Sequence, residues 1–169
     1  EINMFLEKID DTNDLKKLNR KELKELANEV RAALINKISK AGGHSGPNLG
    51  MVEMTVALHY VFDSPNDKFV FDVSHQSYPH KILTGRKEAF LDEEHFHDVT
   101  GYTNPLESEH DMFTIGHTST SVSLALGLAI GRDLNKKAEN IIAIIGDGSL
   151  SGGEALEAID YAGEYNKNL

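Results

Sequence analysis

The sequence Gly146-Asp147-Gly148 ends an apolar, β-branched run over residues 141–145 and could bind a metal-bound phosphate group. Such a run is typical of a buried parallel strand, so Asp147 is expected at the carboxyl end of that strand. Glycine lets backbone amides approach an anion, and a carboxylate can hold a divalent cation. The combination suits a magnesium diphosphate. A tight strand-to-helix turn with a solvated aspartate explains the same three residues.

A helix is expected directly after this segment. Ser151 and Glu154 have the spacing of a capping box, and the helical pattern that follows them runs to about residue 163. The N-terminus of that helix would favour a negatively charged ligand next to Asp147.

Gly116, His117 and Thr118 begin a second segment that could bind phosphate. Hydroxyl residues at 119–121 follow, just ahead of a helical pattern over 122–133. Backbone amides and hydroxyls here could cradle a phosphate, and His117 could add a donor. Ordinary capping of the helix by one of the hydroxyls is the alternative.

Histidines lie in or beside predicted turns at His44, His75 and His80. Imidazole suits proton transfer near neutral pH, and His75 directly follows a predicted strand. A loop histidine can equally be solvated or cap a helix. His59 differs, because it lies in a helical pattern that is apolar around most of its circumference, so we expect it to be a core residue.

Residues 92–111 form a predicted polar excursion. Nitrogen and carboxylate donors together could suit zinc or another transition metal. Their spacing matches no metal motif, so a polar surface segment is the preferred interpretation. The donors concerned are His95, His97, His110, Asp92, Glu93, Glu94, Asp98 and Asp111.

The remaining pattern indicates an α/β fold. Helical patterns cover residues 15–40, 48–62, 78–90, 122–133 and 151–163, and strand patterns cover 68–73 and 141–145. Asn19 and Glu22 have capping-box spacing near the start of the first helix, and Gly85 interrupts the third. Alternating strands and helices predict a parallel sheet flanked by helices, with ligands at the carboxyl ends of its strands.

Composition favours an ordinary globular protein. The 169 residues suffice for one domain, and the net charge of −10 comes from 27 acidic and 17 basic residues. The sequence contains no basic stripe with interleaved aromatic residues, so nucleic acid is not an expected partner. Without cysteine, an N-terminal signal pattern or an apolar run of roughly 20 residues, the chain is expected to be cytoplasmic and to have no membrane partner.

Taken together, the motifs resemble the N-terminal thiamine-diphosphate-binding domain of the 1-deoxy-D-xylulose-5-phosphate synthase family, in the transketolase superfamily. The likeness runs from Leu15 to Gly163, and its most specific part is the stretch His75-Gln-Ser-Tyr-Pro-His-Lys-Ile-Leu-Thr-Gly-Arg86. The segments that carry the resemblance are residues 42–44, 72–86, 116–121 and 146–148.

The resemblance implies roles for individual residues. Asp147 matches the family's magnesium-binding aspartate, and His44 matches an active-site histidine implicated in substrate handling and proton transfer. His75 matches a histidine that contacts the cofactor near its reacting carbon. The positions implied to contact thiamine diphosphate are His75, Gly116, His117, Thr118, Gly148 and Ser149.

The implied reaction joins pyruvate and D-glyceraldehyde 3-phosphate with loss of CO2, in a homodimer that uses thiamine diphosphate and Mg2+. We expect residues 1–169 to be a single diphosphate-binding domain truncated at its C-terminus. A second magnesium ligand and the glutamate that activates the cofactor would then lie outside it, and the isolated chain would be inactive. A transketolase-like two-carbon transfer, or a degenerate domain that acts as a binding module, are the alternatives.

Two departures from the family pattern bear on the site. Ser74 stands where the family usually has glycine. Residues 101–107 lack the basic residues that are common in the corresponding loop, which bears on the choice of substrate.

Overall fold

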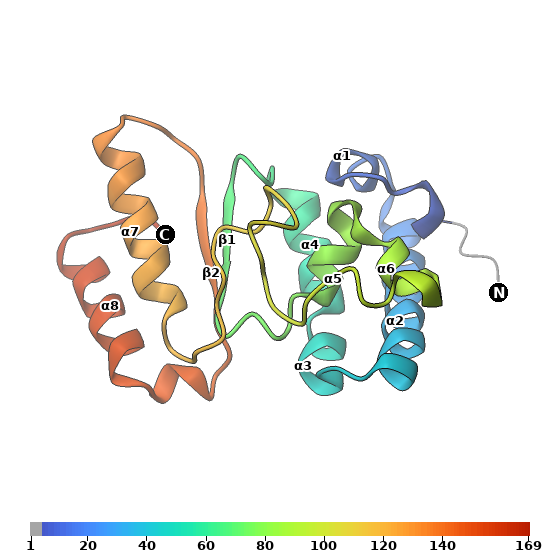
Figure 1. The fold of residues 1–169 in the computed structure, drawn as a ribbon. Coiled ribbons are helices and arrows are strands. Elements are labelled where there is room, and N and C mark those ends of the chain that lie inside the picture. Colours follow the sequence, from blue (N-terminus) through green and yellow to red (C-terminus); the bar gives the residue numbers. More distant parts are fainter. Residues whose placement is uncertain (1–4) are drawn as a thin grey trace. The chain divides into compact units, whose positions relative to one another are not determined.

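The computed structural model describes residues 5–169, which form two compact units (Figure 1). The first, here called the helical unit, comprises residues 5–63 and His75–Gly101. The second, here called the sheet unit, comprises Ser64–Ser74 and Tyr102–Leu169. That both belong to one diphosphate-binding domain truncated at residue 169, with residues 92–111 as a surface excursion, stays a prediction.

The helical unit is built around one long helix. Asn19 begins it as predicted, because its side chain accepts hydrogen bonds from the N–H groups of Lys21 and Glu22 while Glu22 bonds back to Asn19. Gly42, with φ of 78°, ends it. The elements of this unit are η1 (Leu6–Lys8), α1 (Thr12–Leu15), α2 (Arg20–Ala41), α3 (Ser45–Gly50), α4 (Val52–Val61), α5 (Tyr78–Lys81), the π-helical η2 (Ile82–Arg86), α6 (Glu88–Leu91) and η3 (Glu93–His95).

The core of the helical unit lies between α2 and the helices packed on it. Leu26, Val30 and Leu34 are fully buried, and they cluster with Val52 and Val56 of α4. The one helix predicted over residues 48–62 is wrong in detail, because the chain divides into α3 and α4. The interruption predicted within residues 78–90 is confirmed.

A buried lysine of α2 forms hydrogen bonds with α6 and with the segment that follows it. Lys37 Nζ donates to the carbonyl oxygen of Ala89 at 2.9 Å and to that of Phe96, and it lies 4.8 Å from the centroid of the Phe90 ring. The ammonium group is therefore held by carbonyl dipoles and aromatic faces.

The sheet unit contains a parallel pair of strands, as the alternating pattern predicts. β1 (Lys68–Phe71) pairs with β2 (Ile141–Ile144), with Lys68 opposite Ile141 and Phe71 opposite Ile144. The predicted first strand is too long by two residues, because Asp72 and Val73 lie outside β1. Val73 has a φ of 59°, which L-residues rarely adopt in a strand.

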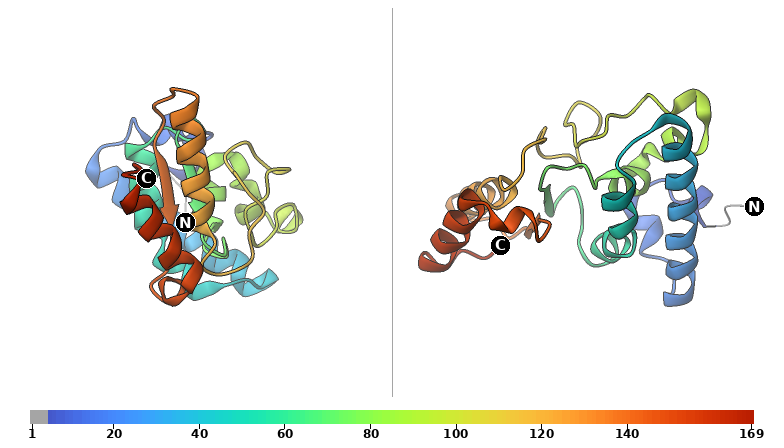
Figure 2. Two further views of the ribbon diagram at one scale, coloured as in Figure 1. Left: turned by 90° about the vertical axis from the view of Figure 1, so that its left-hand side faces the viewer. Right: turned by 90° about the horizontal axis from the view of Figure 1, so that it is seen from below.

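Three helical elements accompany these strands. α7 (Ser121–Leu134) packs on both strands through Ala125 and Ala129, whose small side chains allow close approach to Val70 and Ile141. After β2 come the short η4 (Ser149–Ser151) and α8 (Gly153–Glu164). α8 runs alongside α7 in the views of Figure 2, and the two helices are in contact.

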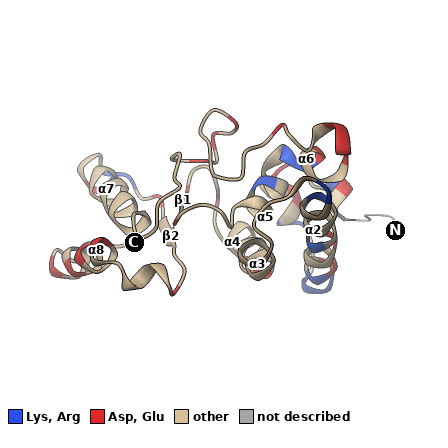
Figure 3. Cartoon of the chain, turned by 60° about the horizontal axis from the view of Figure 1, so that its bottom comes forward, with Lys and Arg blue, Asp and Glu red and all other residues tan. Residues whose placement is uncertain are grey.

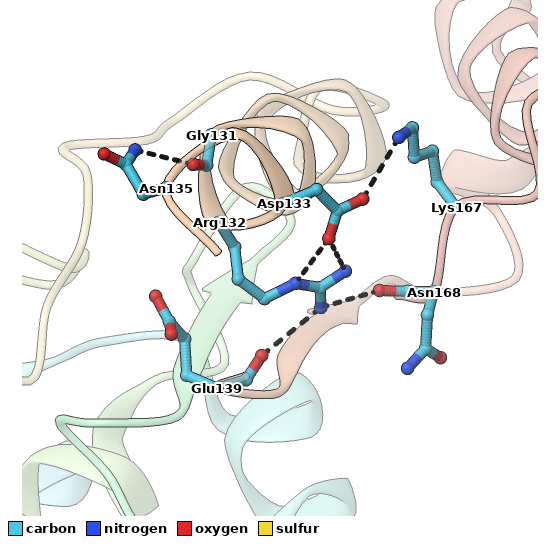
Figure 4. A network of polar contacts seen from close by, with 7 residues as sticks. All are labelled: Gly131, Arg132, Asp133, Asn135, Glu139, Lys167 and Asn168. Carbon is cyan, nitrogen blue, oxygen red and sulfur yellow. Dashed lines mark hydrogen bonds and ion pairs between the residues drawn. The ribbon is translucent and has the colours of Figure 1, made fainter. Parts of the chain in front are cut away.

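An arginine fastens the end of the described chain to α7 (Figure 4). Arg132, largely buried, donates from Nη1 to the carbonyl oxygens of Asn168 at 2.9 Å and Glu139 at 3.2 Å. Its Nη2 contacts Asp133 at 2.8 Å, and Lys167 completes the network with an ion pair to Asp133 at 3.0 Å.

Charge is distributed unevenly over the helices. α8 carries acidic residues without lysine or arginine, whereas α2 carries both signs (Figure 3). Any phosphate ligand of the sheet unit must therefore be held by local groups rather than by a general positive field. Every helix within residues 5–169 is too short or too polar to cross a bilayer.

Candidate functional site

The carboxyl ends of the two strands meet at one edge of the sheet unit. β1 ends at Phe71 and β2 at Ile144, and the N–H of Asp72 donates to the carbonyl oxygen of Ile144 at 2.7 Å. The chain after β2 leads through Ile145 and Gly146 to Asp147, which is exposed. Ligands of parallel sheets collect at this edge, so Asp147 has the position predicted for it.

The hydroxyl-rich segment before α7 is held by a carboxylate rather than by its own side chains. The N–H groups of Ser119 and Ser121 donate to Asp72 Oδ2 and Oδ1, each at 3.0 Å. Thr120, at the N-cap position, makes no side-chain capping bond. The alternative in which one of these hydroxyls caps the helix is therefore wrong, because Asp72 takes that role from the end of β1.

Asp72 is ionised more readily than an ordinary aspartic acid. It is only 1% exposed, and burial by itself would raise its pKa. Hydrogen bonds from the backbone of Ser121 and Ser119 outweigh this effect and hold the pKa of Asp72 below 3.8. The hydroxyl of Ser149 lowers this pKa further.

The segment after β2 folds into a tight turn of small residues. The N–H of Ser149 donates to the carbonyl oxygen of Gly146 at 3.0 Å, and residues 149–151 continue as η4. The capping box predicted for Ser151 and Glu154 is wrong. Ser151 Oγ bonds the carbonyl oxygen of Gly148 at 2.7 Å instead, and Gly152 occupies the N-cap position of α8.

The two glycine-containing loops of the sheet unit touch each other. Ser119 Oγ donates to the carbonyl oxygen of Ser149 at 2.7 Å. A Cβ added to Gly152 would lie only 2.0 Å from Ser119 Oγ, so the backbone of the second loop packs directly on that side chain. The segments that contain Gly116 to Thr118 and Asp147 to Ser149 are thereby joined.

The predicted phosphate-binding groups differ in exposure. Gly116, His117 and Thr118 are exposed, as are Asp147 and Gly148, while Ser149 is half-buried. His117 Nδ1 lies 2.8 Å from the carbonyl oxygen of Thr118, which orients the ring within its own loop.

His44 and His75, the two predicted catalytic residues, lie together on the helical unit. Their rings meet edge to face with centroids 5.2 Å apart. His44 is exposed and His75 half-buried. The fully buried Asn48 joins their backbones, because its Nδ2 donates to the carbonyl oxygens of His44 at 2.7 Å and His75 at 2.9 Å.

His59 and His80 form a separate pair in the same unit. Both are fully buried, their rings are stacked, and His59 Nε2 lies 2.9 Å from His80 Nδ1. The expectation for His59 as a core residue is confirmed. His80 lies in α5, as the helical pattern over 78–90 predicts, and Thr84 Oγ1 donates to its carbonyl oxygen at 2.6 Å. The expectation that it is a loop histidine is wrong, because its side chain is fully buried.

Residues 92–111 use several of their polar side chains locally. His95 Nδ1 pairs with Asp98 at 2.7 Å, which raises the pKa of His95, and His110 bonds Ser64 at 2.8 Å. Across residues 5–169, no group of three or more histidine and acidic side chains could hold a metal ion by itself.

The donor set beside β2 nevertheless fits a metal whose other ligands come from a phosphate. Asp147 provides one hard, exposed carboxylate, and the exposed Gly148 follows it directly. Mg2+ is characteristically bound by one or two protein carboxylates together with substrate phosphates and water. Asp147 and its neighbours therefore suit a magnesium diphosphate better than a free metal ion.

No role is predicted for Asp72 or Asn48, and Ser119 is predicted only as one of the hydroxyls that could bind phosphate or cap the helix. The structure shows that all three residues organise these groups. An aspartate inside the predicted buried strand over 68–73 was the available signal for Asp72. Asn48 carries no signal in the local sequence, because its function depends on carbonyl groups at His44 and His75.

Comparison with known proteins decides the family. A family model described as 1-deoxy-D-xylulose-5-phosphate synthase matches residues 6–169. The chain belongs to the 1-deoxy-D-xylulose-5-phosphate synthase family. This membership confirms the resemblance and the thiamine-diphosphate-binding fold, and enzymes of this family use thiamine diphosphate and Mg2+.

Curated relatives of that name share about half of their residues with this chain. The 1-deoxy-D-xylulose-5-phosphate synthase of Brevibacillus brevis is 51% identical over 166 residues, which cover 98% of this chain and 26% of the relative. That of Halalkalibacterium halodurans is 52% identical with the same coverage. The 1-deoxy-D-xylulose-5-phosphate synthase 1 of Geobacter sulfurreducens is 50% identical over 92% of this chain and 24% of its own length. The chain thus spans about a quarter of the length of these relatives.

Proposed function

We propose that this chain forms the diphosphate-side part of a synthase that condenses pyruvate with D-glyceraldehyde 3-phosphate to 1-deoxy-D-xylulose 5-phosphate and CO2. One observation carries the proposal. A chain of this family has an exposed aspartate and two joined, glycine-containing loops at the carboxyl edge of its parallel sheet. The reaction balances, because the carboxylate carbon of pyruvate leaves as CO2 and its remaining two carbons join the aldehyde carbon.

Asp147 would hold Mg2+, and the segment that follows it, Gly148 and Ser149, would contact the diphosphate. Gly116, His117 and Thr118 would contact the same cofactor from the neighbouring loop. Thiamine diphosphate, when bound, supplies the nucleophile and the electron sink for decarboxylation. The residues of this chain would hold the cofactor in place, and the carboxylate of Asp147 would bind the metal ion.

His44 and His75 would handle substrate and protons. The edge-to-face contact of their rings and the shared anchor at Asn48 support a joint role. His44 is exposed, and its imidazole is suited to exchange a proton with a carbonyl or hydroxyl oxygen of the substrate. His75 would contact the cofactor near its reacting carbon.

The proposal extends to the assembly. The active form would be a cytoplasmic homodimer that acts on small molecules without nucleic acid, and the reaction would be of the transketolase type. A second magnesium ligand and an activating glutamate would come from outside residues 1–169. Those residues alone would therefore turn nothing over.

The test is an assay of the product of the complete open reading frame. Pyruvate, D-glyceraldehyde 3-phosphate, thiamine diphosphate and Mg2+ should give equal amounts of CO2 and 1-deoxy-D-xylulose 5-phosphate, and chelation of Mg2+ should stop both. Residues 1–169 alone should give neither. Transfer of two carbons from a ketose phosphate without CO2 would instead establish a transketolase-like activity, and inactivity with both substrate sets would indicate a binding module.

A further inference from the structure

The carboxylate of Asp72 is the shared anchor of the two loops to which the proposed function assigns the diphosphate. It lies at the end of β1, almost fully buried, and its own N–H extends the pairing with β2 through Ile144. No salt bridge to Asp72 is found among the described residues, and backbone N–H groups of the loop before α7 take both of its carboxylate oxygens.

This anchor fixes an unusual loop conformation. Ser119 has a φ of 71°, in the left-handed region that residues other than glycine seldom adopt. The bonds from Ser119 N and Ser121 N to one carboxylate hold the backbone on both sides of Thr120 in this conformation. The loop is therefore set by Asp72 from a strand end rather than by the propensities of its own residues.

The same loop then holds the second one. Ser119 Oγ donates to the carbonyl oxygen of Ser149, and the absence of a side chain at Gly152 leaves room for this hydroxyl. The hydrogen bonds thus form one chain from Asp72 through Ser119 to Ser149. Its first member directly follows β1 and is bonded through its N–H to Ile144 of β2, and its last lies two residues after Asp147.

We propose that Asp72 is a positioning residue that presets both diphosphate-binding loops, through Ser119, before any cofactor arrives. This inference rests on the proposed function, because it concerns the same site. Loops fixed in advance lose less conformational freedom on binding, so affinity for the diphosphate should depend on a carboxylate that does not touch it.

The chain offers a matched control for a buried carboxylate. Asp67 is also buried and accepts hydrogen bonds from Asn140, from its backbone N–H at 2.7 Å and from Nδ2 at 3.0 Å. It precedes β1, whereas Asp72 follows it, so the two lie at opposite ends of the strand. Asp67→Asn should disturb the sheet unit without reaching either loop.

The first measurement is hydrogen exchange by mass spectrometry on the cofactor-free product of the complete reading frame. Asp72→Asn should speed exchange at residues 116–121 and 146–152 at least tenfold, and Asp72→Ala should do so further, because asparagine keeps one acceptor oxygen. Asp67→Asn should leave both segments as in the wild type. Unchanged exchange in both Asp72 variants would overturn the proposal.

The second measurement compares the affinities of magnesium thiamine diphosphate and of thiamine, which lacks the diphosphate, by calorimetry or competition. Asp72→Asn should lower the affinity for thiamine diphosphate at least tenfold and the affinity for thiamine less than twofold. General destabilisation of the protein would not produce this difference between the two ligands. If the loss of affinity for thiamine diphosphate relative to that for thiamine is the same in Asp72→Asn and in Asp67→Asn, Asp72 only caps a helix. A wild-type protein that binds no thiamine diphosphate would overturn the proposed function together with this inference.

A second variant keeps the proposal testable if Asp72 variants fail to fold. Ser119→Ala leaves the bonds to Asp72 intact and removes only the hydroxyl that reaches Ser149. Ser119→Ala should lower the affinity for thiamine diphosphate about threefold and leave the affinity for thiamine unchanged. In the Asp72→Asn background its additional effect should be smaller, because both residues act along one chain of hydrogen bonds. If the affinity losses of Ser119→Ala and Asp72→Asn simply multiply in the double variant, the two residues do not act through one chain of hydrogen bonds.

Discussion

Asn48 Nδ2 donates a hydrogen bond to the carbonyl oxygen of His75 at 2.9 Å. The same nitrogen donates to the carbonyl oxygen of His44, and Asn48 Oδ1 accepts from the N–H of Tyr78 at 2.9 Å. One buried carboxamide therefore sets the backbone at both proposed catalytic histidines. A side chain with a donor at one end and an acceptor at the other is needed for all three bonds.

Replacement of Asn48 should loosen both histidine segments. Asn48→Ala removes three hydrogen bonds made by a fully buried side chain, so the free energy of unfolding should fall by about 2 to 4 kcal/mol. Asn48→Asp should be at least as harmful, because it turns a carboxylate oxygen toward two carbonyl oxygens. Hydrogen exchange should rise at residues 42–46 and 73–79.

Asn19→Ala is the matched control for Asn48. It removes the cap of α2 in the same unit at a cost of about 1 kcal/mol without touching either histidine. It should leave exchange at residues 42–46 and 73–79 unchanged. If Asn48→Ala behaves like Asn19→Ala in this measurement, Asn48 does not position the histidines.

Loss of the proposed metal ligand should be measurable without turnover. Asp147→Ala should weaken magnesium thiamine diphosphate by about 100-fold or more in the complete protein, because the diphosphate charge loses its metal bridge. Asp160→Ala, at an exposed carboxylate of α8, should leave the affinity unchanged. Calorimetry that gives wild-type affinity for Asp147→Ala would remove this residue from the metal site.

Ser74 should show how the chain accommodates a hydroxyl side chain at a position with a positive φ. The residue is buried with a φ of 67°, and Ser74 Oγ donates to the carbonyl oxygen of Ile115 at 2.9 Å and accepts from Thr103 N at 3.0 Å. Ser74→Ala keeps the strained φ and loses both bonds, so it should cost about 1 to 3 kcal/mol. Ser74→Gly should cost about 1 kcal/mol less, because glycine relieves the strain. Denaturant unfolding that ranks glycine below alanine would contradict this account of the strain.

The sequence could predict those elements whose signals are local. The apolar run at 141–145 and the capping pair of Asn19 and Glu22 each act within a few residues, and both predictions are confirmed. The capping box predicted for Ser151 and Glu154 shows where local signals fail, because a bond from Ser151 Oγ to the carbonyl oxygen of Gly148 competes with it. His80 shows another, because only the tertiary partner His59 reveals that its segment is buried.

The candidate site was predictable in its exposed groups but not in its supports. Asp147 and the loop at 116–118 follow recognisable patterns of glycine, carboxylate and strand end. Asp72 bonds Ser119 across 47 positions of sequence, and a single sequence carries no record of such a pairing. The residues that position a binding site do so through tertiary contacts, so they can be identified only from the folded structure.

The depressed pKa of Asp72 predicts how its contribution to stability changes with pH. Its carboxyl is more acidic in the folded protein than the 3.8 of an unfolded chain, so the ionised form stabilises the fold. This contribution is complete well above pH 3.8 and is lost as the pH falls through the lower, folded pKa. Asp72→Asn has no such group, so the difference in free energy of unfolding between wild type and variant should be constant from about pH 5 to 7 and shrink below pH 4. Urea denaturation at a series of pH values measures this difference directly. A difference that stays constant down to pH 3 would mean that the bonds from Ser119 and Ser121 do not select the ionised carboxylate.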